Sequence, residues 1–187
     1  MGLSLESMAI AMPVVQGHPN RAGFRGVLTV VDGASDRSPS GARGHRVLLT
    51  RGAAEEALPS LLGMALDYAP GLDRHDARRK VGVITQAEIV GRAIEVGGFL
   101  YAKDFPEIVA EIGGPRREGM VSGRRAESSS GYLRSSGAQL GMSYEIADAQ
   151  VEDIKASVWV LNRVTFTGAA ILRRDKAAYR STWIEMV

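Results

Sequence analysis

The sequence predicts a single α+β domain built on a mostly antiparallel β-sheet or barrel with a few surrounding helices. Short apolar segments of strand length recur along the chain, one pair of them alternates as a hairpin does, and only three segments have helical spacing. The chain has 187 residues, 45% of them hydrophobic and 24% charged. A chain of this length buries a sizeable core without a disulfide or a metal.

Seven strands and three helices account for most of the pattern. The hairpin is the clearest signal, because apolar residues alternate on both sides of a turn at Gly91 and Arg92. We expect strands at 24–31, 46–50, 63–68, 81–89, 94–100, 139–147 and 157–167. Helices are expected at 53–62, at 105–112 with Asp104 as the N-cap, and at 175–186.

Two segments, 32–44 and 113–137, are rich in Gly, Ser and Arg and contain few large apolar residues. Such composition favours mobile loops, because little apolar surface is available to order them. We interpret both as mobile excursions from one domain that spans residues 1–187.

Composition excludes several classes of function. The chain has no cysteine, so thiol nucleophiles, zinc ribbons and iron–sulfur clusters are excluded. It contains no phosphate-binding Gly-rich loop, no dinucleotide fingerprint, no His-Glu-x-x-His and no calcium loop, and we expect no cofactor and no metal. The formal charge of +2 does not indicate specific nucleic-acid binding. No apolar run reaches membrane-spanning length and 1–17 does not resemble a signal peptide, so we expect a soluble, unanchored protein without a membrane partner.

Ser143 is the candidate nucleophile. In the strand-like segment 140–146 the large side chains share one face, so Ser143 points to the other, between Gly141 and Glu145. A hydroxyl there attacks a carbonyl if an imidazole accepts its proton. The alternative is a solvated serine on a half-exposed sheet.

The base must be one of three histidines, His18, His45 or His75. His75 is the best placed because it directly precedes the hairpin and has Asp73 and Asp76 beside it. The alternative is an ordinary surface histidine in a loop.

Three segments, 75–84, 98–109 and 140–145, together resemble the prohead maturation proteases of tailed bacteriophages, and the resemblance extends over about 63–172. It implies a fold like that of the herpesvirus assemblins and a serine endopeptidase activity. It also implies that the protein acts in the host cytoplasm, inside the assembling procapsid, on phage capsid and scaffold proteins. We further expect a homo-oligomer.

The resemblance assigns the base to His75 and the nucleophile to Ser143. Many relatives carry a carboxylate as third member on the following strand, but here that strand offers only Asn162 or Arg163. We assign Asn162, because an amide oxygen accepts a hydrogen bond from an imidazole. Nearby carboxylates remain as alternatives: Glu145, Asp148, Glu152 and Asp153.

Two further readings compete with a serine endopeptidase. The missing acid favours a protease-like capsid assembly or scaffold protein that has lost turnover. The third reading is an unrelated β-rich binding module, in which Ser143 and His75 never meet.

Overall fold

A computed structural model describes residues 17–114 and 140–187. The described residues form eight strands and two α-helices, with two short 3₁₀ turns. The strands are β1 (Arg21–Val30), β2 (Arg46–Leu49), β3 (Ala65–Tyr68), β4 (Lys80–Val90), β5 (Ala93–Tyr101), β6 (Leu140–Val151), β7 (Val158–Arg173) and β8 (Trp183–Met186). The helices are α1 (Arg51–Ala57) and α2 (Pro106–Gly113), and the 3₁₀ turns are Ser40–Ala42 and Leu58–Leu61.

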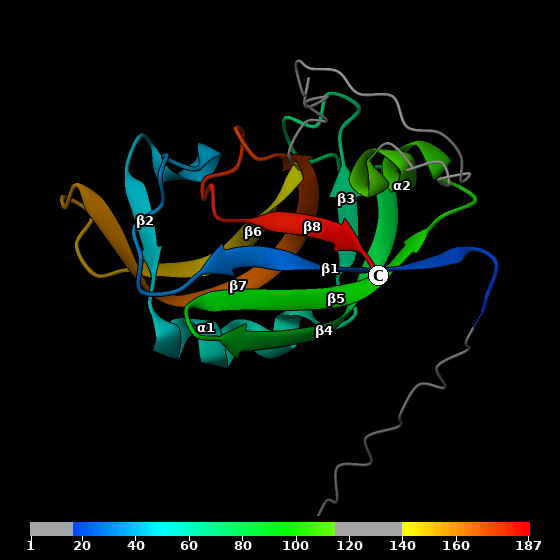
Figure 1. Cartoon of the computed structure of the whole chain (residues 1–187). Helices are drawn as coiled ribbons and strands as arrows, with labels where there is room; N and C mark the ends of the chain where they lie inside the picture. The colour runs from blue at the N-terminus through cyan, green and yellow to red at the C-terminus, as the bar shows by residue number, and fades with distance from the viewer. Residues whose placement is uncertain (1–16, 115–139) are drawn as a thin grey trace, which may run out of the picture.

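The strands form one curled mixed sheet, in which the long strand β7 has three partners (Figure 1). β6 runs antiparallel along one edge of β7. The other edge is shared, because β2 pairs in parallel with the first part of β7 and β3 with its last part. From β3 the sheet continues through antiparallel pairings to β4, β5, β1 and β8.

The prediction of an α+β, mostly antiparallel sheet therefore needs one correction, the two parallel pairings on β7. Both β2 and β3 run in the direction of β7, and α1 with the 3₁₀ turn Leu58–Leu61 carries the chain forward from the first part of β7 to its last part. The sequence pattern predicted this connection as one helix at 53–62, without indicating which strand β2 and β3 would pair with.

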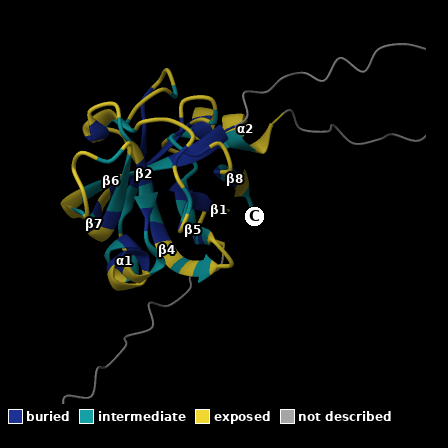
Figure 2. Cartoon of the chain, turned by 90° about the vertical axis from the view of Figure 1, so that its left-hand side faces the viewer, coloured by how far each residue is buried: buried dark blue, intermediate teal, exposed yellow. Residues whose placement is uncertain are grey.

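One hydrophobic cluster fills the inside of the curl and takes side chains from all eight strands. Its fully buried members include Leu28, Leu66, Ile84, Leu100 and Ile171. Exposed residues concentrate on the loops and turns (Figure 2). The core fixes which face of each strand points inward, and so which face is left for chemistry.

The hairpin is confirmed: β4 and β5 pair around Gly91, whose φ of 59° suits glycine. The N-cap prediction was wrong. α2 begins after Phe105, and the Asp104 carboxylate instead accepts a hydrogen bond from Asn20 Nδ2 at 2.7 Å. Among the described helices, none is long and apolar enough to span a membrane.

The helix predicted at 175–186 was also wrong, because its last residues form strand β8 against β1. Trp183 and Ile184 lie opposite Val27 and Gly26. Pairing with β1 buries Ile184. Tertiary pairing outweighs local helical spacing here.

Segment 32–44 packs against the body of the protein, although its composition predicts little burial. Ser35 and Ala42 are buried, and the Asp36 amide donates to the Ala178 carbonyl at 2.9 Å. Small residues make these contacts, which a search for large apolar side chains overlooks. The other predicted loop, 113–137, lies outside the described residues after Gly114.

Candidate active site

Ser143 and Asp67 lie on either side of the same residue of β7. Ser143 on β6 is paired with Ala170, and so is Asp67 on β3. Side chains at paired positions point to the same face of a sheet, and adjacent strands lie about 4.8 Å apart. The serine and the aspartate therefore share a face, with backbones roughly 10 Å apart across β7.

This shared face is the one turned away from the core. The neighbouring row of paired residues, Leu66, Ala169 and Tyr144, belongs to or packs against the hydrophobic cluster. The row of Asp67, Ala170 and Ser143 does not. Because the middle residue is alanine, a third segment can lie over β7 and reach both neighbours.

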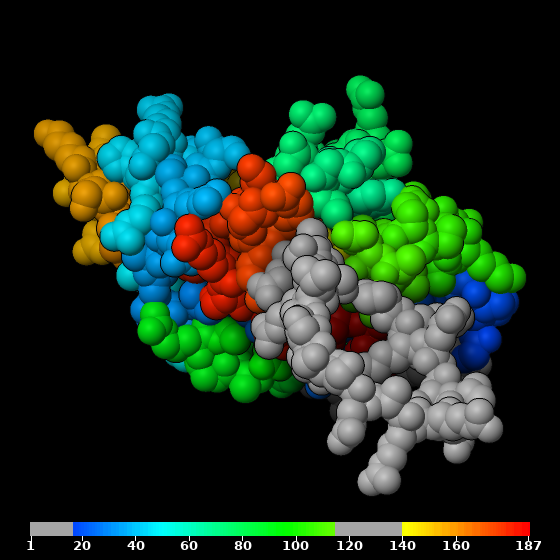
Figure 3. Space-filling model, turned by 45° about the horizontal axis from the view of Figure 1, so that its top comes forward, coloured from blue at the N-terminus to red at the C-terminus, as the bar shows by residue number. Residues whose placement is uncertain are grey.

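That third segment is loop 69–79, between β3 and β4, which carries His75. The loop is tied down at both strands it covers. The Arg173 amide at the end of β7 donates to the Leu72 carbonyl at 2.7 Å, and the Asp76 amide donates to Asp67 Oδ1 at 3.1 Å. It stands beside α2 on one face of the molecule (Figure 3).

The imidazole of His75 lies between two carboxylates. Its Nδ1 is 3.6 Å from Asp67 Oδ1 and 3.9 Å from Glu145 Oε1. The His75 side chain is only 17% exposed, and neither ring nitrogen makes a hydrogen bond in the described structure. Two buried ring nitrogens without partners are unusual unless the site has a role that uses them.

Asp67 is the more strongly held of the two carboxylates. Its side chain is 2% exposed, and its Oδ2 accepts from Lys80 Nζ at 3.1 Å. Burial works to raise the pKa of the Asp67 carboxyl, but contacts with His75, Lys80 and the Asp76 amide outweigh it, so that the pKa is lowered. Asp67 is therefore ionised at neutral pH, with Oδ1 facing the imidazole.

Glu145 reaches His75 because its neighbour on β7 is a glycine. Glu145 follows Ser143 by two residues, so both lie on the same face of β6, and it is paired with Gly168. A Cβ at position 168 would come within 2.7 Å of Glu145 Oε2. The glycine leaves space for the carboxylate over β7, although Glu145 remains 56% exposed.

The strand that carries Ser143 is anchored on its free edge by Thr182. The buried Thr182 hydroxyl accepts a hydrogen bond from the Met142 amide at 3.2 Å and donates to the Tyr179 carbonyl at 2.9 Å. A side chain at Gly141 would collide with that hydroxyl, 2.6 Å from an added Cβ. These contacts hold the two residues that precede the serine.

The arrangement brings an imidazole and a buried carboxylate to the face of the sheet that also carries a serine. A buried carboxylate faces Nδ1 of an imidazole, the other ring nitrogen has no partner in the described structure, and a serine lies two residues from a carboxylate that also faces the ring. A carboxylate at Nδ1 holds the ring orientation and stabilises the imidazolium that forms when the ring accepts a proton.

The other two histidines have different contacts. His45 stacks on Trp159 with ring centroids 4.6 Å apart, and its Nδ1 lies 2.9 Å from the Ala156 carbonyl. His18 Nδ1 accepts from the Asn20 amide at 3.2 Å, next to the start of β1. Of the three candidates, His75 is the one that the structure places beside the serine strand.

The structure does not bring Asn162 to His75. Asn162 is exposed and follows Leu161, which pairs with Leu49 of β2, at the other end of β7 from Ala170. Eight residues separate Asn162 from Ala170, on the order of 25 Å along an extended strand. Asp67 takes the place by the imidazole instead.

Among the alternative acids, Glu145 is the one in contact with His75. Asp148 accepts from the Thr165 hydroxyl at 3.2 Å further along the hairpin. Glu152 and Asp153 lie at its turn, where Asp153 Oδ1 accepts from the Lys155 amide at 2.8 Å. Sequence reasoning missed Asp67, although an aspartate inside the apolar run 65–69 is a signal for a buried, paired carboxylate.

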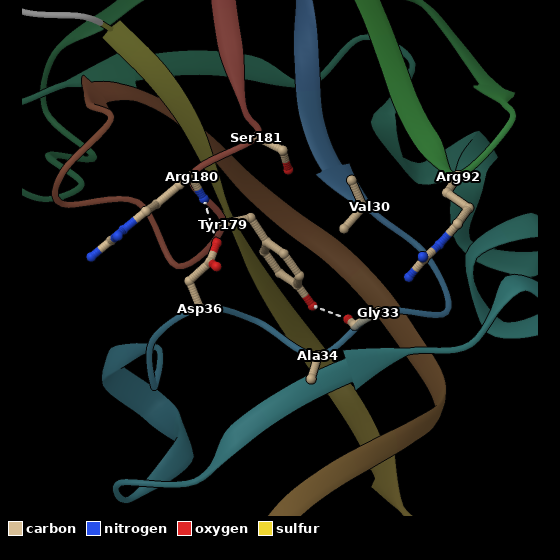
Figure 4. A pocket seen from close by; sticks show the side chains of 8 residues that line it. All are labelled: Val30, Gly33, Ala34, Asp36, Arg92, Tyr179, Arg180 and Ser181. Carbon is tan, nitrogen blue, oxygen red and sulfur yellow. Dashed lines mark hydrogen bonds between the residues drawn. The ribbon is translucent and has the colours of Figure 1, made fainter.

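A hollow of about 500 Å³ lies between the end of β1 and the residues before β8 (Figure 4). The polar groups that line this hollow make hydrogen bonds to neighbouring parts of the chain. The Tyr179 hydroxyl donates to the Val47 carbonyl at 3.0 Å, Asp36 accepts from the Arg180 amide at 2.7 Å, and Arg92 donates to the Val31 carbonyl at 3.1 Å. Ser143, His75 and Asp67 do not line it.

No protein-family model and no curated protein matches the chain. The residues of the site and the three sequence segments that resemble prohead maturation proteases therefore provide the basis for a functional proposal. Within the described residues, no group of three histidine, aspartate or glutamate side chains is arranged to hold a metal ion.

Proposed function

We propose that the protein is a serine endopeptidase with Ser143 as nucleophile, His75 as general base and Asp67 as the carboxylate that orients the base. The observation that carries the proposal is the position of His75 Nδ1, 3.6 Å from a buried aspartate that shares its β7 neighbour with Ser143. The proposal replaces Asn162 by Asp67 as third member.

The chemistry follows from this arrangement. Ser143 Oγ attacks the scissile carbonyl carbon while His75 Nε2 takes the hydroxyl proton, and the imidazolium then gives that proton to the leaving amine. Water then attacks the acyl carbon while the same nitrogen takes its proton, and the imidazolium returns that proton to Ser143 Oγ as the bond between the serine and the acyl group breaks. Asp67 stays ionised throughout and stabilises the imidazolium.

The resemblance to prohead maturation proteases supports a more specific proposal. In it the fold is assemblin-like, and a homo-oligomer cleaves capsid and scaffold proteins inside the assembling procapsid in the host cytoplasm. The second candidate is a protease-like assembly protein without turnover, which the lack of a carboxylate on β7 favours. Asp67 weakens the case for this second candidate, since a carboxylate reaches the imidazole from β3.

A fluorophosphonate probe tests the activity without knowledge of the cleavage sequence. The serine oxygen forms a bond to phosphorus and fluoride leaves, a reaction that an activated serine performs far faster than an ordinary one. We expect covalent labelling of Ser143 in the wild type, no labelling of Ser143→Ala, and normal labelling of Ser157→Ala, whose serine is exposed before β7.

Ser143→Ala should leave the fold intact, with stability within about 0.5 kcal/mol of wild type, because it removes one half-buried hydroxyl outside the core. Co-expression with phage capsid and scaffold proteins then tests the substrate class, and processing should stop in this variant. A well-folded wild type that the probe never labels would contradict the proposal, as would unchanged processing by Ser143→Ala.

A further inference from the structure

Lys80 makes a contact in the site that the triad alone does not require. It is the first residue of β4 and is paired with Asp67 of β3 next to an irregularity in the strand register. Its Nζ lies 3.1 Å from Asp67 Oδ2. The Lys80 side chain is 41% exposed.

The two oxygens of Asp67 have separate partners. Oδ2 accepts from Lys80, and Oδ1 accepts from the Asp76 amide and faces His75 Nδ1. A carboxylate fixed at one oxygen cannot rotate freely about its last bond. Lys80 and the Asp76 amide together therefore hold the carboxylate in the orientation in which Oδ1 faces the imidazole.

The charges around Asp67 come from each element that packs against it. The loop contributes His75, and Asp76, whose own carboxylate lies 3.8 Å from Arg79. β6 contributes Glu145, and the facing residue of β7 is the uncharged Ala170. Within the described structure, Lys80 supplies the cation in direct contact with the Asp67 carboxylate.

We propose that Lys80 is a positioning residue of the site, which holds the Asp67 carboxylate ionised and aligned with His75. The inference rests on the proposed function and adds a fourth member to its machinery. A cation beside the Asp67–His75 pair also disfavours binding of an extra proton by the pair. Lys80 therefore extends the pH range over which the base is free to act.

The test is the pH profile of fluorophosphonate labelling for wild type, Lys80→Met and Lys80→Arg. We expect Lys80→Met to label about tenfold more slowly at the plateau and to lose labelling at a higher pH as the solution is acidified. Lys80→Arg keeps the charge and should keep the acid limb near its wild-type position. Lys155→Met, at the turn between β6 and β7, is the matched control and should reproduce the wild-type profile.

A purely structural role for Lys80 would lower the plateau without moving the acid limb, and an unmoved limb in folded Lys80→Met overturns the inference. Labelling of wild type but not of Ser143→Ala shows in the same experiment that the proposed function stands. If Lys80→Met does not fold, Lys80→Gln replaces it. A carbon-13 NMR titration of the Asp67 carboxyl in the Ser143→Ala background provides a readout without turnover, and a pKa unchanged by Lys80→Met overturns the inference as well.

Discussion

At the scale of single residues, Asp67 and Glu145 compete for the same ring nitrogen, and their surroundings separate them. Asp67 is buried and held by Lys80 and the Asp76 amide, whereas Glu145 is mostly exposed. Water screens an exposed carboxylate, so its interaction with the imidazole is weak. The buried aspartate is pre-organised and is therefore the stronger partner for His75.

Substitution of the three candidates for the third member separates their roles. We expect Asp67→Asn to slow labelling by about 10³–10⁴-fold, because an amide favours the wrong imidazole tautomer. Glu145→Gln should slow it by less than about tenfold, as an exposed charge contributes about 1 kcal/mol or less. Asn162→Ala should label at the wild-type rate, since Asn162 lies at the far end of β7.

Labelling rates of the three variants, measured at one pH, decide among the alternatives. A larger loss in Glu145→Gln than in Asp67→Asn would make Glu145 the third member. If none of the three matters while Ser143 and His75 do, the site works as a dyad.

At the scale of elements, the local sequence pattern correctly predicted the features that depend on residues close together in the sequence. The hairpin of β4 and β5 follows from alternation and a glycine turn, and all seven predicted strand segments overlap observed strands. The missed features depend on partners distant in the chain. β8 forms because β1 offers it an edge, and Asp67 meets the serine strand because β3 and β6 both pair with β7. The amino-acid sequence alone does not indicate the register of β3 and β6 on β7.

Thr182 tests how strongly the segment before β8 holds the serine strand. Thr182→Val keeps the shape of the side chain but leaves the buried Met142 amide without its partner and removes one of the two donors to the Tyr179 carbonyl. We expect a loss of about 1–3 kcal/mol in the free energy of unfolding. That corresponds to a melting temperature lower by about 2–4 °C for each kcal/mol.

Thermal unfolding followed by circular dichroism measures the effect, with Thr167→Val on the exposed face of β7 as control. The control should unfold near the wild-type temperature. Equal melting temperatures for both variants would show that the Thr182 hydroxyl does not anchor β6.

At the scale of the whole molecule, the site is built onto the sheet that encloses the core. The three strands that carry or support its residues also supply the core beneath it through Leu66, Ala169 and Met142. The Met142 sulfur would lie 2.9 Å from a Cβ at Gly26, so β6 also packs closely against β1 across the inside of the curl. Interactions within the site therefore also contribute to the free energy of unfolding of the whole domain.

The pH dependence of unfolding follows from the Asp67 carboxyl. Because its pKa in the folded protein is lowered, it stabilises the fold above the ordinary pKa of an unfolded aspartate, about 3.9. That contribution is lost as the pH falls through the lower folded value. Asp67→Asn should be less stable than wild type at neutral pH, by on the order of 1 kcal/mol. The difference should shrink in acid below about pH 3.9, where the wild type loses its advantage.

Guanidinium unfolding across a pH series measures this difference, with Glu56→Gln on the exposed side of α1 as control for the loss of one negative charge. A gap between wild type and Asp67→Asn that stays constant into strong acid would show that the ionised carboxylate does not stabilise the fold, and would also remove the electrostatic basis for its role beside His75.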